Sequence, residues 1–160
     1  MGNFKRSILI AITLFAASFC FAKQITLQIV QHDELSDKVF ESSMVVEDEL
    51  LNGFFDNGFI VTNSPASVSA SSLQDVNLFN TGIGDAYEGS SEYFLQIKLY
   101  YNAAQSSEKS DLIEVDWTLA SAITGVTIKE NTIKNKYSDT KDLKMLSANL
   151  VKEITKAIKA

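Results

Sequence analysis

The stretch EYFLQIKLYY, residues 92–101, alternates two kinds of side chain along its length. Apolar or aromatic residues occupy every odd position, while Gln96 and Lys98 lie between them. A period of two is typical of a β-strand with one buried and one solvated face. The same alternation recurs over residues 111–120, and a Thr-Gly turn then leads to apolar residues at 126 and 128. This half of the chain is therefore predicted to form a three-stranded meander.

The remaining segments predict two more strands and three helices. Residues 24–31 alternate like a strand, and an Asn-Gly pair ends the helical pattern that precedes the short strand at 59–62. Pro65 is expected to open a Ser- and Ala-rich loop that runs through Ser71. A Ser-x-x-Asp capping box at Ser72 favours a second helix. The helices are predicted over Ser36–Asn57, from Ser72 to about Tyr87, and over Thr140–Lys159.

These elements follow one another in the order β-α-β-α-β-β-β-α. Such an order predicts the α+β class, with a mixed sheet of about five strands and three helices. Because the later strands alternate, we expect a two-layer sandwich in which helices cover one face of the sheet.

The amino terminus has the pattern of a secretion signal. Lys5-Arg6 is followed by an uncharged apolar run, residues 8–19, that is too short to span a bilayer. Ala22 and Cys20 place small residues at −1 and −3 of a cut before Lys23. We therefore predict that residues 1–22 are cleaved and that 23–160 form one domain in the periplasm or outside the cell. A lipoprotein anchored at Cys20 is the disfavoured alternative, because Phe19 is bulky.

Composition narrows the class of partner. Twelve Lys against 20 Asp and Glu leave residues 23–160 with a net charge of −8 and without any Arg or Cys. Such a domain repels nucleic acid and anionic membrane surfaces. The absence of cysteine in an exported chain is more typical of a bacterial envelope protein than of a eukaryotic extracellular module.

Residues that could carry chemistry are few. His32, the only histidine, is expected in a surface turn rather than in a metal site, since zinc requires three or four ligands. Glu114 and Asp116 share one face of a strand, and paired carboxylates serve glycoside hydrolysis. A cross-strand ion pair with Lys98 or Lys129 is the ordinary explanation. We predict no catalytic residue, cofactor or metal.

Glu47 differs from its neighbours on the helix predicted over 36–57. On a helical wheel it falls near the middle of a wide apolar arc that includes Phe40, Met44 and Phe55. A carboxylate buried there would need a partner, so Glu47 is either structural or a poised functional group. The width of the arc indicates that some of its side chains meet other helices or another chain, namely Phe40, Met44, Leu51 and Phe55.

Two segments support a resemblance to known families. ELLNGFFDNGFIVTN, residues 49–63, and DAYEGSSEYFLQIKLYY, residues 85–101, resemble small exported spirochaetal proteins of unknown function. The element order is similar to periplasmic domains of the TolB amino-terminal type, which include lipoprotein activators of penicillin-binding proteins. Residues 122–125 keep the Thr-Gly turn of that type, with Ser121 where its Asp would be. No functional residue carries over.

We therefore expect a non-enzymatic adaptor domain that contacts another envelope protein. Its interaction surface is predicted on the solvated sheet face, at Lys98, Glu114 and Asp116, or near Pro65. A homodimer is also considered, and no membrane insertion is expected after cleavage. Two alternatives stay open. One is a hydrolase built on the carboxylates named above, and the other is a carrier of an apolar ligand or lipid, lined by aromatic residues: Phe54, Phe55, Phe94, Tyr100 and Trp117.

Overall fold

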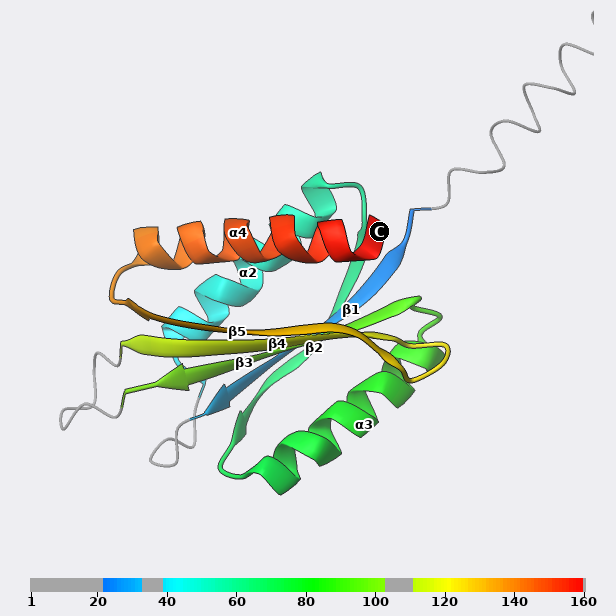
Figure 1. Ribbon diagram of the computed structural model, residues 1–160, viewed down its shortest axis with the longest axis horizontal. Helices are drawn as coiled ribbons and strands as arrows, with labels where there is room; N and C mark the ends of the chain where they lie inside the picture. Colours follow the sequence, from blue (N-terminus) through cyan, green and yellow to red (C-terminus); the bar gives the residue numbers. More distant parts are fainter. Residues whose placement is uncertain (1–21, 33–38, 103–110, 160) are drawn as a thin grey trace, which may run out of the picture.

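The computed structural model describes residues 22–32, 39–102 and 111–159. Residues 1–21 of the predicted signal lie outside these ranges. The described chain forms five strands and three helices (Figure 1). In order, they are β1 (Gln24–His32), α2 (Glu41–Asp56), β2 (Ile60–Ser69), α3 (Ser72–Glu88), β3 (Tyr93–Tyr101), β4 (Leu112–Ser121), β5 (Thr127–Tyr137) and α4 (Thr140–Lys159). The predicted α+β class and element order are confirmed.

The strands form one mixed sheet in the order β2-β1-β3-β4-β5. Strand β1 is parallel to both β2 and β3, whereas β4 is antiparallel to β3 and β5. Parallel neighbours need a crossover connection, which α2 and α3 provide. The predicted meander is the antiparallel half, β3-β4-β5.

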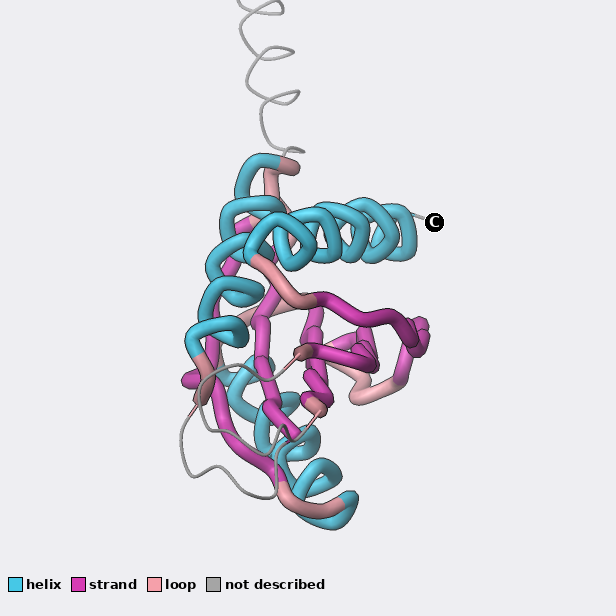
Figure 2. Tube along the Cα trace, turned by 90° about the vertical axis from the view of Figure 1, so that its left-hand side faces the viewer, coloured by secondary structure: helices cyan, strands magenta, loops and turns pink. Residues whose placement is uncertain are grey.

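Helices lie against both faces of this sheet (Figures 1 and 2). Helices α2 and α4 cover one face and enclose the main core, which includes Leu50, Leu95 and Trp117. Helix α3 lies on the opposite face, where Ala86 packs with Phe94 in a second, smaller cluster. The two-layer arrangement therefore describes the β4–β5 half, while α3 adds a third layer beside β1, β2 and β3.

The two helices on the main core meet at a close contact. Gly53 of α2 lies against Val151 of α4, and a Cβ at position 53 would be only 2.7 Å from Val151 Cγ2. Beside this contact, Lys144 of α4 forms a 2.8 Å ion pair with Glu49 of α2. The absence of a side chain at Gly53 thus lets α2 and α4 form one continuous helical layer.

Strand β2 is longer than predicted, and the loop expected from Pro65 to Ser71 is wrong. Pro65 lies inside β2, which pairs with β1 through Ser69. An edge strand tolerates proline because the missing N–H can face away from the sheet. The pairing with β1 shifts register between Ser64 and Ser67, so a bulge accommodates the proline.

Two helix starts also differ from the prediction. Helix α2 begins at Glu41, not Ser36; Phe40 is extended, and its N–H donates to Gln31 Oε1 of β1 at 2.7 Å. Residues 36–38 lie outside the described residues. In α3 the capping residue is Ser71 rather than Ser72, because Ser71 Oγ accepts from the Gln74 N–H.

Candidate functional site

The half of the sheet that α3 leaves uncovered carries a polar surface. Figure 2 shows α3 beneath one side of the sheet, and among the described residues no helix lies beneath β4 and β5. Cross-strand registers place two rows of polar side chains side by side on this face. We call this surface the polar sheet face, and it consists of Lys98, Tyr100, Glu114, Asp116, Thr132 and Lys134.

Asp116 is the central acceptor of the polar sheet face. Its Oδ1 accepts a hydrogen bond from Thr132 Oγ1 at 2.7 Å. Its Oδ2 accepts from Tyr100 Oη at 3.2 Å and lies 3.4 Å from Lys98 Nζ. Three neighbours from β3 and β5 therefore hold this carboxylate in one orientation.

Lys98 and Tyr100 each keep a single protonation state at neutral pH. Burial alone would lower the pKa of Lys98, but Tyr100, Asp116 and Asp75 together raise that pKa above its ordinary value. Burial is also the main reason that the pKa of Tyr100 is raised. At neutral pH the ammonium stays charged and the phenol stays protonated, so neither is poised as a base.

Glu114 forms the second ion pair of the surface. It lies 3.0 Å from Lys134 Nζ, its register partner on β5. The expected cross-strand pairing is thus found, with Lys98 for Asp116 and Lys134 for Glu114. Lys129 does not take part, because it pairs with Glu153 on the opposite face. Both carboxylates of the Glu114 and Asp116 pair are thus held in ion pairs.

A second polar group adjoins this surface at the ends of β1 and β2. His32 is the last residue of β1, not part of a surface turn as expected. Its Nε2 lies 2.8 Å from Asp75 Oδ1, and its ring stacks on Tyr100 at 4.4 Å. Ser69 Oγ donates to the same Asp75 oxygen at 2.6 Å. In a catalytic triad histidine lies between serine and the acid, so this order does not activate Ser69.

The remaining predicted site residues lie elsewhere. Glu47 is half-buried rather than buried, and its Oε1 accepts from Asn63 Nδ2 of β2 at 2.8 Å. The wheel misplaced it because the buried stripe of α2 is narrower than the arc; this stripe comprises Ser43, Val46, Leu50 and Phe54. Pro65 lies on β2, at the sheet edge opposite β5. The structure therefore brings together Lys98, Glu114 and Asp116, but not Glu47 or Pro65.

The aromatic residues considered for a carrier do not surround one space. Phe54 and Trp117 are buried in the main core, whereas Phe94 is buried in the cluster under α3, across the sheet. Phe55 is 73% exposed, and Tyr100 stacks on His32. Their division between the two faces of the sheet gives the carrier alternative no support.

The described residues contain no group of three or more His, Cys, Asp or Glu side chains that could hold a metal ion. Within the same ranges, no helix is both long and apolar enough to cross a bilayer.

Sequence reasoning missed the residues that β5 contributes to the polar sheet face. Thr132 and Lys134 belong to β5, which was recognised only at its first apolar residues. Asp75 was interpreted as a capping residue, yet its side chain turns to His32 and Ser69. Residues 129–136 are almost all polar, so their sequence does not indicate which side chains share a face of the strand. The pairing with β4 places Thr132 and Lys134 beside Asp116 and Glu114.

Solved structures share this fold at low sequence identity. The PelC dodecamer from Paraburkholderia phytofirmans matches with a TM-score of 0.50 and 12% identity, covering 88% of this chain and 91% of that one. Protein XCC0632 from Xanthomonas campestris matches with a TM-score of 0.50 and 14% identity, covering 87% of each chain. TolB from Acinetobacter baumannii gives 0.50 and 13%, covering 86% of this chain but 28% of that one.

These likenesses show the fold alone, and they agree with the predicted similarity to TolB-type domains. No curated protein matches the chain. A family model described only as "Uncharacterised protein" matches residues 24–159, which is nearly the whole predicted domain. The chain therefore belongs to this uncharacterised family.

Proposed function

We propose that residues 23–160 form a periplasmic, non-enzymatic adaptor domain that binds another envelope protein through the polar sheet face. The observation that carries this proposal is the array of charged side chains on the part of the sheet that no described helix covers. Two cross-strand ion pairs hold these charges in place, Lys98 with Asp116 and Lys134 with Glu114. A partner therefore meets side chains that are already oriented. Charges of both signs in fixed positions favour specific recognition of one partner over nonspecific binding.

The comparisons support this role without specifying a partner. PelC, a protein of the same fold, is a dodecamer, so this fold is compatible with protein association. The negative net charge and the predicted export signal favour an envelope protein over nucleic acid. We also propose that the signal is cut before Lys23, which amino-terminal sequencing of the exported chain tests directly.

In-cell photo-crosslinking tests the binding surface. A photoreactive residue replaces Lys134, which is 73% exposed, and in a control strain replaces Glu88, which is exposed on α3. The proposal predicts one abundant envelope protein crosslinked from position 134 and absent from position 88. The same partner from both positions, or only self-crosslinks from 134, would contradict it.

A charge swap separates recognition from folding. In Glu114→Lys with Lys134→Glu, the ion pair is kept but its direction across the strands is reversed. We expect unchanged thermal stability and loss of the crosslinked partner. Retention of the partner by the folded swap variant would show that the polar sheet face is not the binding surface.

A further inference from the structure

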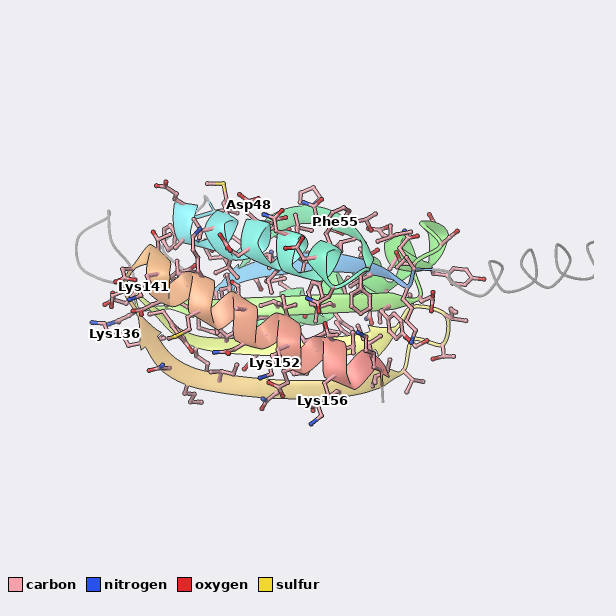
Figure 3. The ribbon with its side chains drawn as sticks, turned by 90° about the horizontal axis from the view of Figure 1, so that it is seen from above. Asp48, Phe55, Lys136, Lys141, Lys152 and Lys156 are labelled. Carbon is pink, nitrogen blue, oxygen red and sulfur yellow. The ribbon has the colours of Figure 1, made fainter. Side chains whose placement is uncertain are left out.

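Charge is unevenly distributed between the two helices of the main layer. Residues 127–160 contain eight of the twelve Lys of the predicted domain and four of its 20 acidic residues. Helix α2 contains five acidic residues and no Lys, whereas α4 contains five Lys. An acidic helix and a basic helix therefore lie side by side on the same face of the sheet (Figure 3).

The outward charges of these helices are largely unpaired within the chain. Asp48 is exposed on α2, and Lys141, Lys152 and Lys156 are exposed on α4 (Figure 3). Asp56 is also exposed, at the end of α2. Within the described residues, none of these five side chains forms an ion pair. Only Glu49 and Lys144 join the two helices by charge, at 2.8 Å. The intrachain geometry thus leaves both charge sets available to another molecule.

Large apolar side chains accompany these charges. Phe55 is 73% exposed on α2, and Met44 is 48% exposed on the same helix. Met145 is 57% exposed on α4. A surface that combines exposed aromatic and methionine side chains with unpaired charges has the composition of a protein interface.

The helix directions make this face complementary to itself. Glu49 lies beside Lys144 and Gly53 beside Val151, so α2 and α4 run in the same direction. A twofold axis parallel to the helices would place α2 of one copy over α4 of another, in the same direction and at the same level. Asp56 then faces the turn between Lys152 and Lys156 of the second copy.

We propose that the outward face of α2 and α4 binds a second copy of this chain as a twofold-symmetric dimer. Each copy contributes an acidic helix to the other's basic helix, as an isologous interface requires. Phe55 packs on the aliphatic stems of Lys152 and Lys156 of the second copy. This surface lies across the sheet from the polar sheet face, so dimerisation and partner binding can occur together.

The size of the face predicts a reversible dimer. Helices of 16 and 20 residues are about 24 and 30 Å long, and two helices about 10 Å apart cover roughly 500 Å² in projection. This is somewhat below the 800 Å² or so that each partner buries in a standard interface. We therefore expect micromolar dissociation that weakens as salt rises.

Complementary charge reversals test the arrangement by sedimentation equilibrium of the chain purified after export. One variant carries Asp48→Lys with Asp56→Lys, and the other carries Lys152→Glu with Lys156→Glu. Each variant alone opposes like charges, so its dimer should be weakened about 10-fold or more. An equimolar mixture restores opposite charges at every contact and should form a heterodimer at least as readily as the unchanged chain.

A matched control variant and three contrary outcomes complete the test. Asp85→Lys with Glu88→Lys makes the same change of net charge on α3 and should leave dimerisation unchanged. Phe55→Ala should weaken the dimer while preserving the circular dichroism spectrum, because its ring is mostly exposed. A chain that stays monomeric at low salt and high micromolar concentration would overturn the proposal. So would a mixture of the two reversed variants that fails to associate, or assemblies that grow beyond two copies.

Discussion

Replacing Gly82 by alanine should destabilise the protein, although alanine is the better helix former. Gly82 lies inside α3, directly over the ring of Phe94. A Cβ at this position would lie 2.6 Å from Phe94 Cε2 and closer still to Cζ, whereas relaxed carbon contacts are about 3.5–4 Å. Phe94 is fully buried, so its ring has little room to move. Gly84 provides the matched control, because nothing lies within 4 Å of its added Cβ.

The two substitutions should change the free energy of unfolding in opposite directions. Alanine stabilises a helix interior by about 1 kcal/mol relative to glycine, and Gly84→Ala should realise most of that gain. Overpacking costs about 1–3 kcal/mol. Since the helix gain of alanine offsets part of this cost, Gly82→Ala should lower the free energy of unfolding by about 1 kcal/mol in total. The variants should therefore differ by about 2 kcal/mol.

Urea unfolding followed by tryptophan fluorescence measures this difference. Trp117 is the only tryptophan and is buried in the main core. With an m-value of about 1.5 kcal/mol per M, the two midpoints should differ by roughly 1 M. If Gly82→Ala proved as stable as Gly84→Ala, the close approach of α3 to Phe94 would be refuted.

Four other substitutions test the site and the core. Asp116→Asn leaves the partly buried Lys98 without its anionic partner and should lower the free energy of unfolding in urea by about 1–2 kcal/mol. Lys134→Met breaks an exposed ion pair and should lower it by about 0.5 kcal/mol or less. Equal losses in the two variants would contradict the central role of Asp116. Burial raises the pKa of Tyr101 in the folded protein above its ordinary value of 10. The stabilisation that comes from the protonated phenol is therefore complete below about pH 10, and it is lost as the pH rises through the pKa of the folded state. Tyr101→Phe should make that alkaline decline of unfolding free energy shallower, and an unchanged slope would count against a buried phenol. Glu47→Gln should change stability by about 0.5 kcal/mol or less, since the carboxylate is half-exposed; a loss above about 2 kcal/mol in thermal unfolding would restore the hypothesis of a critical buried charge.

The elements that sequence reasoning placed well are those in which one physical pattern dominates. Strand β3 alternates because its odd positions face the main core, and α4 repeats its leucines every three or four residues for the same reason. Phe94 is the informative exception, since it lies on the polar side of β3 yet is buried. Its burial depends on α3 crossing that face, which no local pattern records.

Strand β2 and the candidate site were harder to predict for a different reason. The residues around Pro65 have low strand propensity, and β2 forms because β1 offers a free edge for pairing. The pairs Lys98–Asp116 and Glu114–Lys134 depend on the register between strands, which the length of the preceding loops decides. Lys98, Glu114 and Asp116 could be chosen by their shared face, but Thr132 and Lys134 could not.

The division of the core between two faces of the sheet has a consequence for local opening. Among the residues that the structure describes, the main core contains 22 buried side chains, whereas the cluster beneath α3 contains three, Ala86, Phe94 and Ala122. Helix α3 can therefore detach at a lower free energy than global unfolding, as a cooperative unit of its own. Amide hydrogens of α3 should then exchange with solvent well before those of α4. Each such opening would separate Asp75 from His32 and briefly expose the side of the sheet that α3 covers, including the ring of Phe94.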